Sequence, residues 1–307
     1  MIKVRSMTHY ITHHCTLNCI HCNTFNNFNF KGSVDWLAER DNYKKWSEKV
    51  TTDNIGVLGG EPLLHPNLEQ ILRDIHDWHR PIEGICLSTN GTLLDKLVAL
   101  KDVFIETNTT LSISLHSLRW MRKWLTQFKK HFPKLKLSVC NDDDLDLERY
   151  TFTDPSGLKG EIVVWTFFHE ATVMEDNGRF TVHDSDMNKA HEACDSKECH
   201  SIYKNKLYKC RIAALIKEFV TQNESNFTLT TKQRQLIDQE YGIALDEMDS
   251  NTNEKIKEPL SLCAICPENF DKYANLSTFF DAKIRKQKNK VVPRYGTGHS
   301  KPIPIRS

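Results

Sequence analysis

The sequence predicts an α/β fold in which a largely parallel sheet curves around a polar lumen, followed by a smaller cysteine-rich region. Short β-branched runs alternate with amphipathic helical stretches through the first half of the chain, which is typical of repeated βα units. Within the strands, apolar side chains alternate with small polar ones at a period of two. From about residue 168 the succession of strands and helices stops, and polar, cysteine-bearing sequence follows.

The expected strands and helices follow from hydrophobic periodicity. Runs of aliphatic and β-branched residues predict six strands, at residues 7–13, 54–58, 84–89, 110–115, 135–140 and 161–167. Apolar residues at helical spacing predict four helices between them, at residues 36–50, 68–78, 93–98 and 118–132. The second of these helices follows Pro66, a residue type that is favoured where helices begin.

One face of the predicted sheet is polar. In the third strand Ile85 and Leu87 face one way, while Cys86, Ser88 and Asn90 face the other. The same division recurs in the next two strands, with polar Ser112, Ser114, His116, Ser138 and Cys140. A parallel sheet covered by helices on both faces reads as continuous apolar runs, so the pattern favours a barrel whose lumen holds a polar ligand. Ligands of barrels lie at the carboxyl ends of strands, where Glu61, Asn90, His116 and Asp142 fall.

Composition narrows the class of protein. The chain has 307 residues, 39% of them hydrophobic, and a formal net charge of +1, which gives no overall field favouring nucleic acid or a membrane surface. No charged-then-apolar leader and no bilayer-length apolar stretch is apparent, so we expect a cytoplasmic protein without membrane or nucleic-acid partners. Its ten cysteines favour metal binding or catalysis over disulfides, because cytosolic thiols stay reduced.

Three cysteines in one short loop provide the clearest chemical signal. Cys15, Cys19 and Cys22 are separated by three and then two residues, and they follow the first predicted strand. Structural zinc sites and ordinary electron-transfer clusters use four protein ligands, so three thiolates leave one metal position open for an exogenous ligand. The alternative is a zinc site in which His13 or His14 serves as the fourth ligand.

This C-x3-C-x2-C loop resembles that of the radical S-adenosylmethionine (SAM) superfamily, which places it after the first strand of a partial (β/α)6 barrel. In that family a Gly-Gly-Glu-Pro run ends the second strand, as residues 59–62 do here, and residues 5–167 resemble the whole barrel. The resemblance implies that Cys15, Cys19 and Cys22 hold a [4Fe-4S] cluster. It further implies that SAM is contacted by His21, Gly59, Gly60, Glu61, Pro62, Ser88, Asn90 and Ser114.

The resemblance also implies the reaction. One electron from an external reductant, such as a flavodoxin or ferredoxin, cleaves SAM at the cluster into methionine and a 5′-deoxyadenosyl radical, which takes a hydrogen atom from the substrate. The glycines would let the backbone approach the ligand, and Glu61 would accept from its ammonium group. We therefore expect an oxidoreductase or related radical-based modifying enzyme that acts on a small molecule or a peptide.

A second set of cysteines lies too far along the chain to serve the same cluster. Cys194 is followed after ten residues by Asn205 and after four more by Cys210, which resembles the opening of the SPASM and twitch extensions of the superfamily. Asn205 replaces the usual glycine, and asparagine also tolerates a left-handed turn. The resemblance implies one auxiliary iron–sulfur cluster, a [4Fe-4S] cluster on Cys210, Cys263, Cys266 and either Cys194 or Cys199. A tetrahedral zinc ion on the same residues is the alternative.

Two further lumen residues are candidates for catalysis. Cys140, at the end of the fifth predicted strand, could return a hydrogen atom to a substrate radical, and His116 could contact substrate or ribose. The predicted organisation is a radical SAM barrel over residues 1–170, a twitch-like domain over 171–282 and a basic, flexible tail over 283–307. The alternative function is a metal-stabilised binding or electron-carrier protein that does not cleave SAM.

Overall fold

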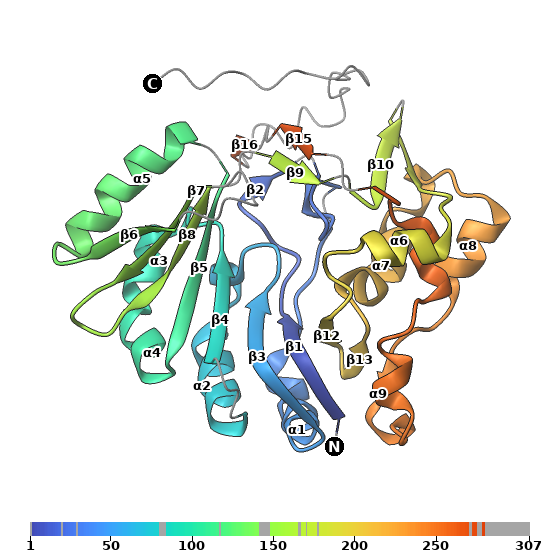
Figure 1. The fold of residues 1–307 in the computed structure, drawn as a ribbon, viewed down its shortest axis with the longest axis horizontal. Coiled ribbons are helices and arrows are strands. Elements are labelled where there is room, and N and C mark those ends of the chain that lie inside the picture. The colour runs from blue at the N-terminus through green and yellow to red at the C-terminus, as the bar shows by residue number, and fades with distance from the viewer. Residues whose placement is uncertain are drawn as a thin grey trace.

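A ten-stranded sheet forms the centre of the protein, and helices pack along it (Figure 1). The computed structural model describes residues 2–19, 21–28, 30–79, 84–116, 118–140, 148–164, 167–169, 171–176, 178–269, 272–274 and 278–279. In spatial order the strands are β14 (Ile243–Ala244), β13 (Lys206–Tyr208), β12 (Cys199–Tyr203), β1 (Ile2–Tyr10), β3 (Val50–Leu58), β4 (Gly84–Thr89), β5 (Thr109–Leu115), β8 (Lys159–Val164), β7 (Glu148–Thr153) and β6 (Lys136–Cys140).

The first half of the chain builds a parallel sheet from βα units, which confirms the predicted fold class. Strands β1, β3, β4, β5 and β8 are neighbours and run parallel, as expected of a partial barrel. The connecting helices are α1 (Trp36–Ser47), α2 (Leu68–Trp78), α3 (Leu94–Ala99), α4 (Lys101–Glu106) and α5 (Leu118–His131). The short 3-10 helices η1 (Asn26–Phe28) and η2 (Pro62–Leu64) lie in the loops that follow β1 and β3.

The order of the last three strands corrects the sequence prediction. The strand predicted at 135–140 is β6, which lies at the edge of the sheet, whereas β8 takes the place beside β5. Strand β7, which the sequence pattern missed, pairs antiparallel with both. Burial explains the order: Ile162 and Val164 of β8 are buried, whereas Val139 of β6 is 68% exposed. An exposed strand is tolerated at an edge but not in the middle of a sheet.

The strand registers confirm that one face of the sheet is polar. Ser88 of β4 lies opposite Ser112 of β5, and Ser112 lies opposite Glu161 of β8. The row continues through Thr151 of β7 to Ser138 of β6. The intervening residues point to the other face, where they form the buried core with the helices, as Ile85, Leu87, Leu111, Ile113 and Leu115 do. Because successive side chains of a strand alternate, the polar face is continuous across five strands.

Residues after 167 extend the same sheet on its other side. Strand β12 pairs parallel with β1 and antiparallel with β13. The turn between β12 and β13 places Lys204 and Asn205 at φ values of 45° and 61°, which confirms the expected left-handed turn at Asn205. The predicted boundaries after residues 170 and 282 stay predictions, and the tail at 283–307 lies outside the described residues.

Short elements complete this region. They are β9 (Phe167–His169), β10 (Val173–Asp176), β11 (Arg179–Val182), α6 (Met187–Ala193), α7 (Arg211–Gln222), η3 (Glu224–Asn226), α8 (Thr231–Asp238), η4 (Leu245–Glu247), α9 (Thr252–Lys255), η5 (Ser261–Ile265), β15 (Lys272–Ala274) and β16 (Thr278–Phe279). Strand β16 pairs with β2 (Leu17–Asn18), which lies within the first cysteine loop. None of the helices in the described ranges is long and apolar enough to cross a bilayer.

Candidate functional site

The first cysteine loop begins at the carboxyl end of β1, with Cys15 five residues beyond the last strand residue, Tyr10. Burial raises the pKa of Cys15, and the charges of Cys22 and Cys19 raise it further, so the three thiols lie close together. Across the described residues, no three His, Cys, Asp or Glu side chains are near enough to hold a single metal ion. A set of three neighbouring thiols is the donor set that an iron–sulfur cluster with one open position requires.

The thiol of Cys22 has neutral polar neighbours that the sequence pattern did not single out. The Sγ of Cys22 lies 3.1 Å from Thr24 Oγ1 and 3.5 Å from Asn26 Oδ1. Thr24 also donates to Asn26 Oδ1 at 2.6 Å, and the Asn26 amide donates to the His13 carbonyl. The only available signal was their position directly after the loop. These contacts fix the Cys22 end of the loop against the end of β1.

The glycines of the Gly-Gly-Glu-Pro run serve the chain itself. A Cβ atom on Gly59 would lie 2.5 Å from the Thr12 carbonyl oxygen, and one on Gly60 would overlap the His14 carbonyl group. In addition, Gly60 N donates to Thr12 O and Glu61 N donates to His14 O, both at 2.7 Å. The close approach expected toward a ligand is therefore observed toward the segment that leads into Cys15. These two glycines allow the loop to sit directly on the end of β3.

Glu61 is fully buried and binds groups of the chain. Its carboxylate accepts from Thr89 Oγ1 at 2.7 Å, from Asn90 N at 2.8 Å and from Leu63 N at 3.1 Å. Burial raises the pKa of Glu61 to about 7, although these hydrogen bonds oppose the shift. The carboxylate thus joins the ends of β3 and β4, and its expected contact with a ligand ammonium group stays a prediction. Pro62 starts η2 directly after it and is buried as well.

Asn90 connects the end of β4 to the cysteine loop. Its Nδ2 donates to Thr16 Oγ1 at 3.0 Å and approaches Cys15 Sγ at 3.6 Å. Its Oδ1 accepts from Thr92 N at 3.0 Å and from Thr92 Oγ1 at 2.6 Å. Asn90, which alternation along the strand predicted to face the lumen, is therefore in contact with the first cysteine of the loop.

The remaining candidate residues lie on the strands of the polar face, at the end of β5 and within the cysteine loop. Ser88 and Ser114 belong to the polar face of β4 and β5, as predicted from alternation. Burial lowers the pKa of His21 and lowers that of His116 to about 4. Cys140 shares the polar face through its pairing with Arg149, but it lies on the edge strand β6, with its Sγ 3.9 Å from Thr151 Oγ1. The interpretation of Cys140 as the end of the fifth barrel strand is therefore wrong.

His13, one of the two candidate fourth ligands of a zinc site in this loop, has other contacts. His13 is buried, its Nε2 lies 2.8 Å from the Tyr203 hydroxyl, and its ring stacks on Phe30 with centroids 3.6 Å apart. The Tyr203 hydroxyl in turn donates to Glu218 Oε2 at 2.7 Å. His13 thereby links the cysteine loop to β12 and α7.

The second cysteine set converges from three segments. Cys194 ends α6, Cys210 immediately precedes α7, and Cys263 and Cys266 lie in and directly after η5. Burial raises the pKa of Cys266, and the charges of Cys210, Cys263 and Cys194 raise it further, so these thiols lie within electrostatic reach of one another, while no three of them are near enough to hold a single metal ion. Cys199 stands apart: it is exposed and starts β12, paired with Ser6 of β1.

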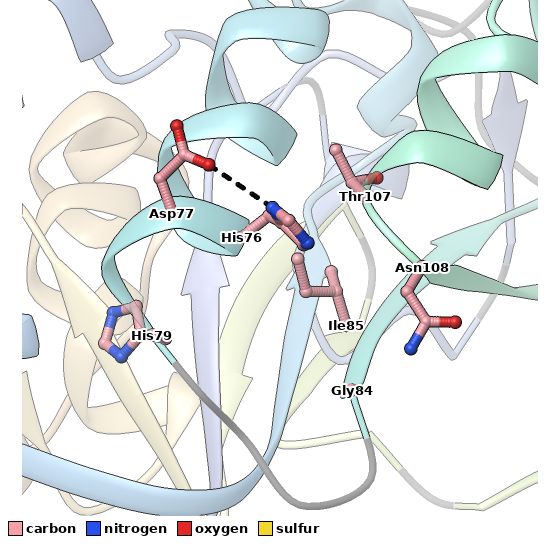
Figure 2. A pocket seen from close by; sticks show the side chains of 7 residues that line it. All are labelled: His76, Asp77, His79, Gly84, Ile85, Thr107 and Asn108. Atoms are coloured by element: carbon pink, nitrogen blue, oxygen red, sulfur yellow. Dashed lines mark hydrogen bonds and ion pairs between the residues drawn. The ribbon is translucent and has the colours of Figure 1, made fainter.

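A separate cavity of about 370 Å³ lies at the opposite end of the strands. Figure 2 shows its lining, which includes His76 and His79 near the end of α2 and Asn108 before β5. His76 Nδ1 lies 3.3 Å from Asp77 Oδ1. Gly84, at the amino end of β4, also lines it. Because the cysteine loop follows the carboxyl end of β1 and the strands are parallel, this cavity belongs to a different part of the molecule.

The chain matches a known family over its barrel. Residues 9–140 match the model of the Radical SAM superfamily. A probable GTP 3',8-cyclase of Methanococcus aeolicus is 32% identical over 118 residues, which cover 38% of this chain and 38% of that protein. A GTP 3',8-cyclase of Aquifex aeolicus is 33% identical over 112 residues, which cover 35% of this chain and 34% of that protein. The matches thus span well under half the length of these curated relatives.

Solved structures give a weaker likeness. The crystal structure of BtrN in complex with AdoMet and 2-DOIA overlaps 37% of this chain and 47% of its own, at 20% identity and a TM-score of 0.30. Scores this low support no argument about the site. The family match spans the cysteine loop, the Gly-Gly-Glu-Pro run and the strands that carry Ser88, Asn90 and Ser114. Residues 9–140 are therefore similar to the radical SAM superfamily of enzymes.

Proposed function

We propose that this protein cleaves SAM at a [4Fe-4S] cluster on Cys15, Cys19 and Cys22 and uses the resulting radical to take hydrogen from a small molecule or a peptide. The similarity of residues 9–140 to the radical SAM superfamily supports the assignment of the cluster and SAM. The observation that carries the proposal is the contact between Asn90 and Cys15, because it joins the polar face of the sheet to the cysteine loop. When bound, the cluster and SAM supply the electron and the 5′-deoxyadenosyl radical.

The residues of the chain orient and enclose these groups. Gly59 and Gly60 hold the loop against the end of β3, and Glu61 holds that end against β4. The polar face supplies hydroxyl groups, such as those of Ser88 and Ser114, for the polar parts of SAM. An external reductant, such as a flavodoxin or ferredoxin, provides the electron.

The substrate is proposed only as a class. The curated relatives are named for GTP, but the matched regions are short, and the polar face offers little positive charge away from Lys136 and Lys159, which begin β6 and β8. Arg149, the cationic side chain of β7 on that face, lies 3.7 Å from Glu161 Oε2 and is thereby paired. Hydroxyl groups dominate the face instead, and they suit a substrate of low charge.

We further propose that Cys194, Cys210, Cys263 and Cys266 hold one auxiliary cluster in a twitch-like extension. The mutual proximity of these four thiols supports the assignment, and the exposed position of Cys199 argues against it as the fourth ligand. Four thiolates close the coordination of a cluster. Such a site suits electron transfer, for example accepting an electron from a substrate radical, better than direct binding of substrate.

Anaerobic reconstitution with iron and sulfide tests the proposal. After chemical reduction, the protein is expected to convert SAM to 5′-deoxyadenosine, and Cys15→Ala is expected to show only background. Product at the level of Cys15→Ala would overturn the enzymatic proposal in favour of a binding or electron-carrier protein. Metal analysis tests the second site: about eight irons per chain indicate two four-iron clusters, whereas four irons with one zinc would replace the auxiliary cluster by a structural site.

A further inference from the structure

One surface of the barrel carries positive charge that no neighbouring acidic residue offsets. From residue 107 to residue 141 the chain contains no aspartate or glutamate. We use the term basic surface for six exposed cations of helix α5 and of the segment that leads into β6, namely Arg122, Lys123, Lys129, Lys130, Lys134 and Lys136. Within the described part of the chain none of the six forms an ion pair; the ion pairs on either side of this stretch join Lys101 to Asp102 and Arg149 to Glu161.

The cations of α5 lie on the outer side of the helix. Arg122 and Lys129 are seven residues apart, as are Lys123 and Lys130, so the members of each pair lie two turns apart on the same side. The opposite side is apolar: Phe128 is buried and packs against an aromatic ring of β7. The helix thus covers one face of the sheet and presents a row of positive charge to solvent beside β6 (Figure 1).

Strand β6, which follows this helix, has a free edge. It is the last strand of the ten-stranded sheet, and among the described strands it pairs only with β7. The backbone N–H and C=O groups on its outer side are therefore open to another strand. Because β6 and β8 both pair antiparallel with β7, β6 runs in the same direction as the parallel strands. Its last residue, Cys140, lies at the end of the sheet where the first cysteine loop follows β1.

Two features of this edge differ from those of an edge that is only protected against aggregation. Lysine side chains alone often serve such protection. Here, however, Val139 of the edge strand is 68% exposed, whereas protection would favour a charged or covered side chain. In addition, four of the six cations belong to α5, which has no strand edge to protect. An exposed apolar side chain beside several cations suits a partner that brings acidic and apolar side chains.

We propose that the free edge of β6 and the basic surface bind an acidic, extended segment of a peptide substrate, which adds to the sheet as a further strand. The inference rests on the proposed function, since it selects one of the two substrate classes proposed there. Backbone hydrogen bonds would supply affinity, and alternate side chains would supply specificity. One set of side chains would lie beside Ser138 on the polar face, and the other would lie beside Val139 and the cations of α5.

The surface suits a peptide better than a nucleic acid. Single-stranded nucleic acids stack their bases on exposed aromatic rings, but Trp124, Phe128 and Phe132, in the described part of this region, are buried. A free strand edge also offers carbonyl acceptors together with N–H donors. Both match a second peptide backbone and not a chain of phosphate groups.

The edge lies within reach of the candidate SAM site. Strand β4, which Asn90 follows, lies five strand positions from a strand added at β6, a distance of about 24 Å along the sheet. About seven extended residues span this distance. The acidic segment would stay at the edge, while a residue further along the same peptide would enter the hydroxyl-lined face and approach the cysteine loop.

Peptide binding to the reconstituted full-length protein tests the inference without turnover. The probe is a short fluorescein-labelled peptide that alternates glutamate with threonine or valine, and binding is measured by fluorescence anisotropy. The peptide is expected to bind, and to bind more weakly as the salt concentration rises. Lys130→Glu combined with Lys134→Glu should weaken binding about 10-fold. Lys44→Glu combined with Lys45→Glu, which changes two exposed lysines at the end of α1, is the matched control and should leave binding unchanged.

Backbone-methylated peptides separate strand pairing from attraction between charges. Two versions of the probe carry N-methyl groups on one or the other set of alternate amides, so both keep the charge of the parent peptide. The version whose methyl groups face β6 should bind about 10-fold more weakly, because it loses a row of donors. Equal binding of all three peptides would overturn strand addition, and so would the absence of binding.

Two further outcomes separate this inference from its alternatives. Tighter binding of an oligouridylate of the same length than of the acidic peptide would overturn the inference in favour of a nucleic-acid surface. Formation of 5′-deoxyadenosine without peptide binding would overturn the peptide site alone. Peptide binding without formation of 5′-deoxyadenosine would overturn the proposed function and not the peptide site.

Discussion

The two cysteine regions of this protein differ in how they are assembled and in the charge around them. Residues 15–22 supply the first three thiols from one loop, whereas the second four come from three segments. The charges acting on Cys15 are those of Cys22, Cys19 and Glu61, all of them negative. The charges around the second set are mixed: Lys209 lowers the pKa of Cys263, whereas Asp195 raises and Arg211 lowers that of Cys194.

The different number of thiols and the different surrounding charges would suit the two proposed clusters to different steps of electron transfer. Negative surroundings make it harder to add an electron and keep the reduction potential low, whereas positive surroundings raise it. Under the proposed function, the first cluster would pass an electron to SAM and the second would accept one from a substrate radical. Three thiolates leave a coordination position for SAM, and four leave none.

Helix α7 joins the two regions. It begins directly after Cys210, and more than two turns later Phe219 stacks on Phe25, which follows the first loop by three residues, with centroids 4.6 Å apart and planes within 11°. Gln222, at its end, donates to the Lys31 carbonyl oxygen at 2.9 Å. Each site therefore depends on the position of one shared helix.

The largest effect is expected from a pair of substitutions that distinguishes Cys210, a proposed metal ligand, from Cys199, which lies outside the set. Cys210→Ala removes a thiol from the second set and should eliminate its metal, lowering the iron content by about half. Cys199→Ala changes an exposed residue outside the set and should keep the full content. Iron and sulfide analysis of both reconstituted variants decides the matter. Loss of iron in Cys199→Ala, with retention in Cys210→Ala, would show that Cys199 and not Cys210 belongs to the ligand set of the second site.

A smaller effect should follow from truncating the contact between α7 and the first loop. Phe219→Ala should lower the free energy of unfolding by about 3–5 kcal/mol, since this side chain is fully buried, and should reduce metal at both sites. Phe152→Ala, equally buried on the opposite side of the sheet, is the control and should lower stability without selective loss of metal. Identical metal contents in the two variants would mean that α7 does not couple the sites.

The smallest effect is expected in the pH dependence of folding stability, and it arises from Glu61, which lies beside the first cysteine region. Burial raises the pKa of Glu61 from 4.5 to about 7, so the folded state holds its proton more tightly than the unfolded state. This contribution to stability is complete below about pH 4.5 and is lost as the pH rises through about 7, with a slope of at most about 1.4 kcal/mol per pH unit. Glu61→Gln should flatten the decline measured by denaturant unfolding between about pH 5 and pH 8. An unchanged slope would contradict the shifted pKa; exposed Glu69→Gln is the control.

Local patterns predicted the features that depend on neighbouring residues. The βα units, the polar face and the place of the first cysteine loop follow from periodicity and spacing, and the turn at Asn205 follows from its conformational tolerance. The position of β8 between β5 and β7 depends on pairing between strands that are distant in sequence, which local patterns do not encode. Its apolar Ile162, Val163 and Val164 were the available signal for a central strand.

Contacts between segments that are distant in sequence could not be predicted from local patterns either. Spacing could not separate Cys194 from Cys199, because the choice depends on how α6 and β12 meet η5 in space. The role of Gly59 and Gly60 changed for the same reason, since the segment they pack against precedes them by more than forty residues.

The most direct test of the comparison is the electron paramagnetic resonance spectrum of each reduced cluster with and without SAM. Cys210→Ala retains the first site, and Cys15→Ala retains the second. SAM is expected to change the spectrum of Cys210→Ala protein, because three thiolates leave an iron open, and to leave that of Cys15→Ala protein unchanged. A response of the second cluster to SAM, or none at the first, would contradict the account of one open and one closed site.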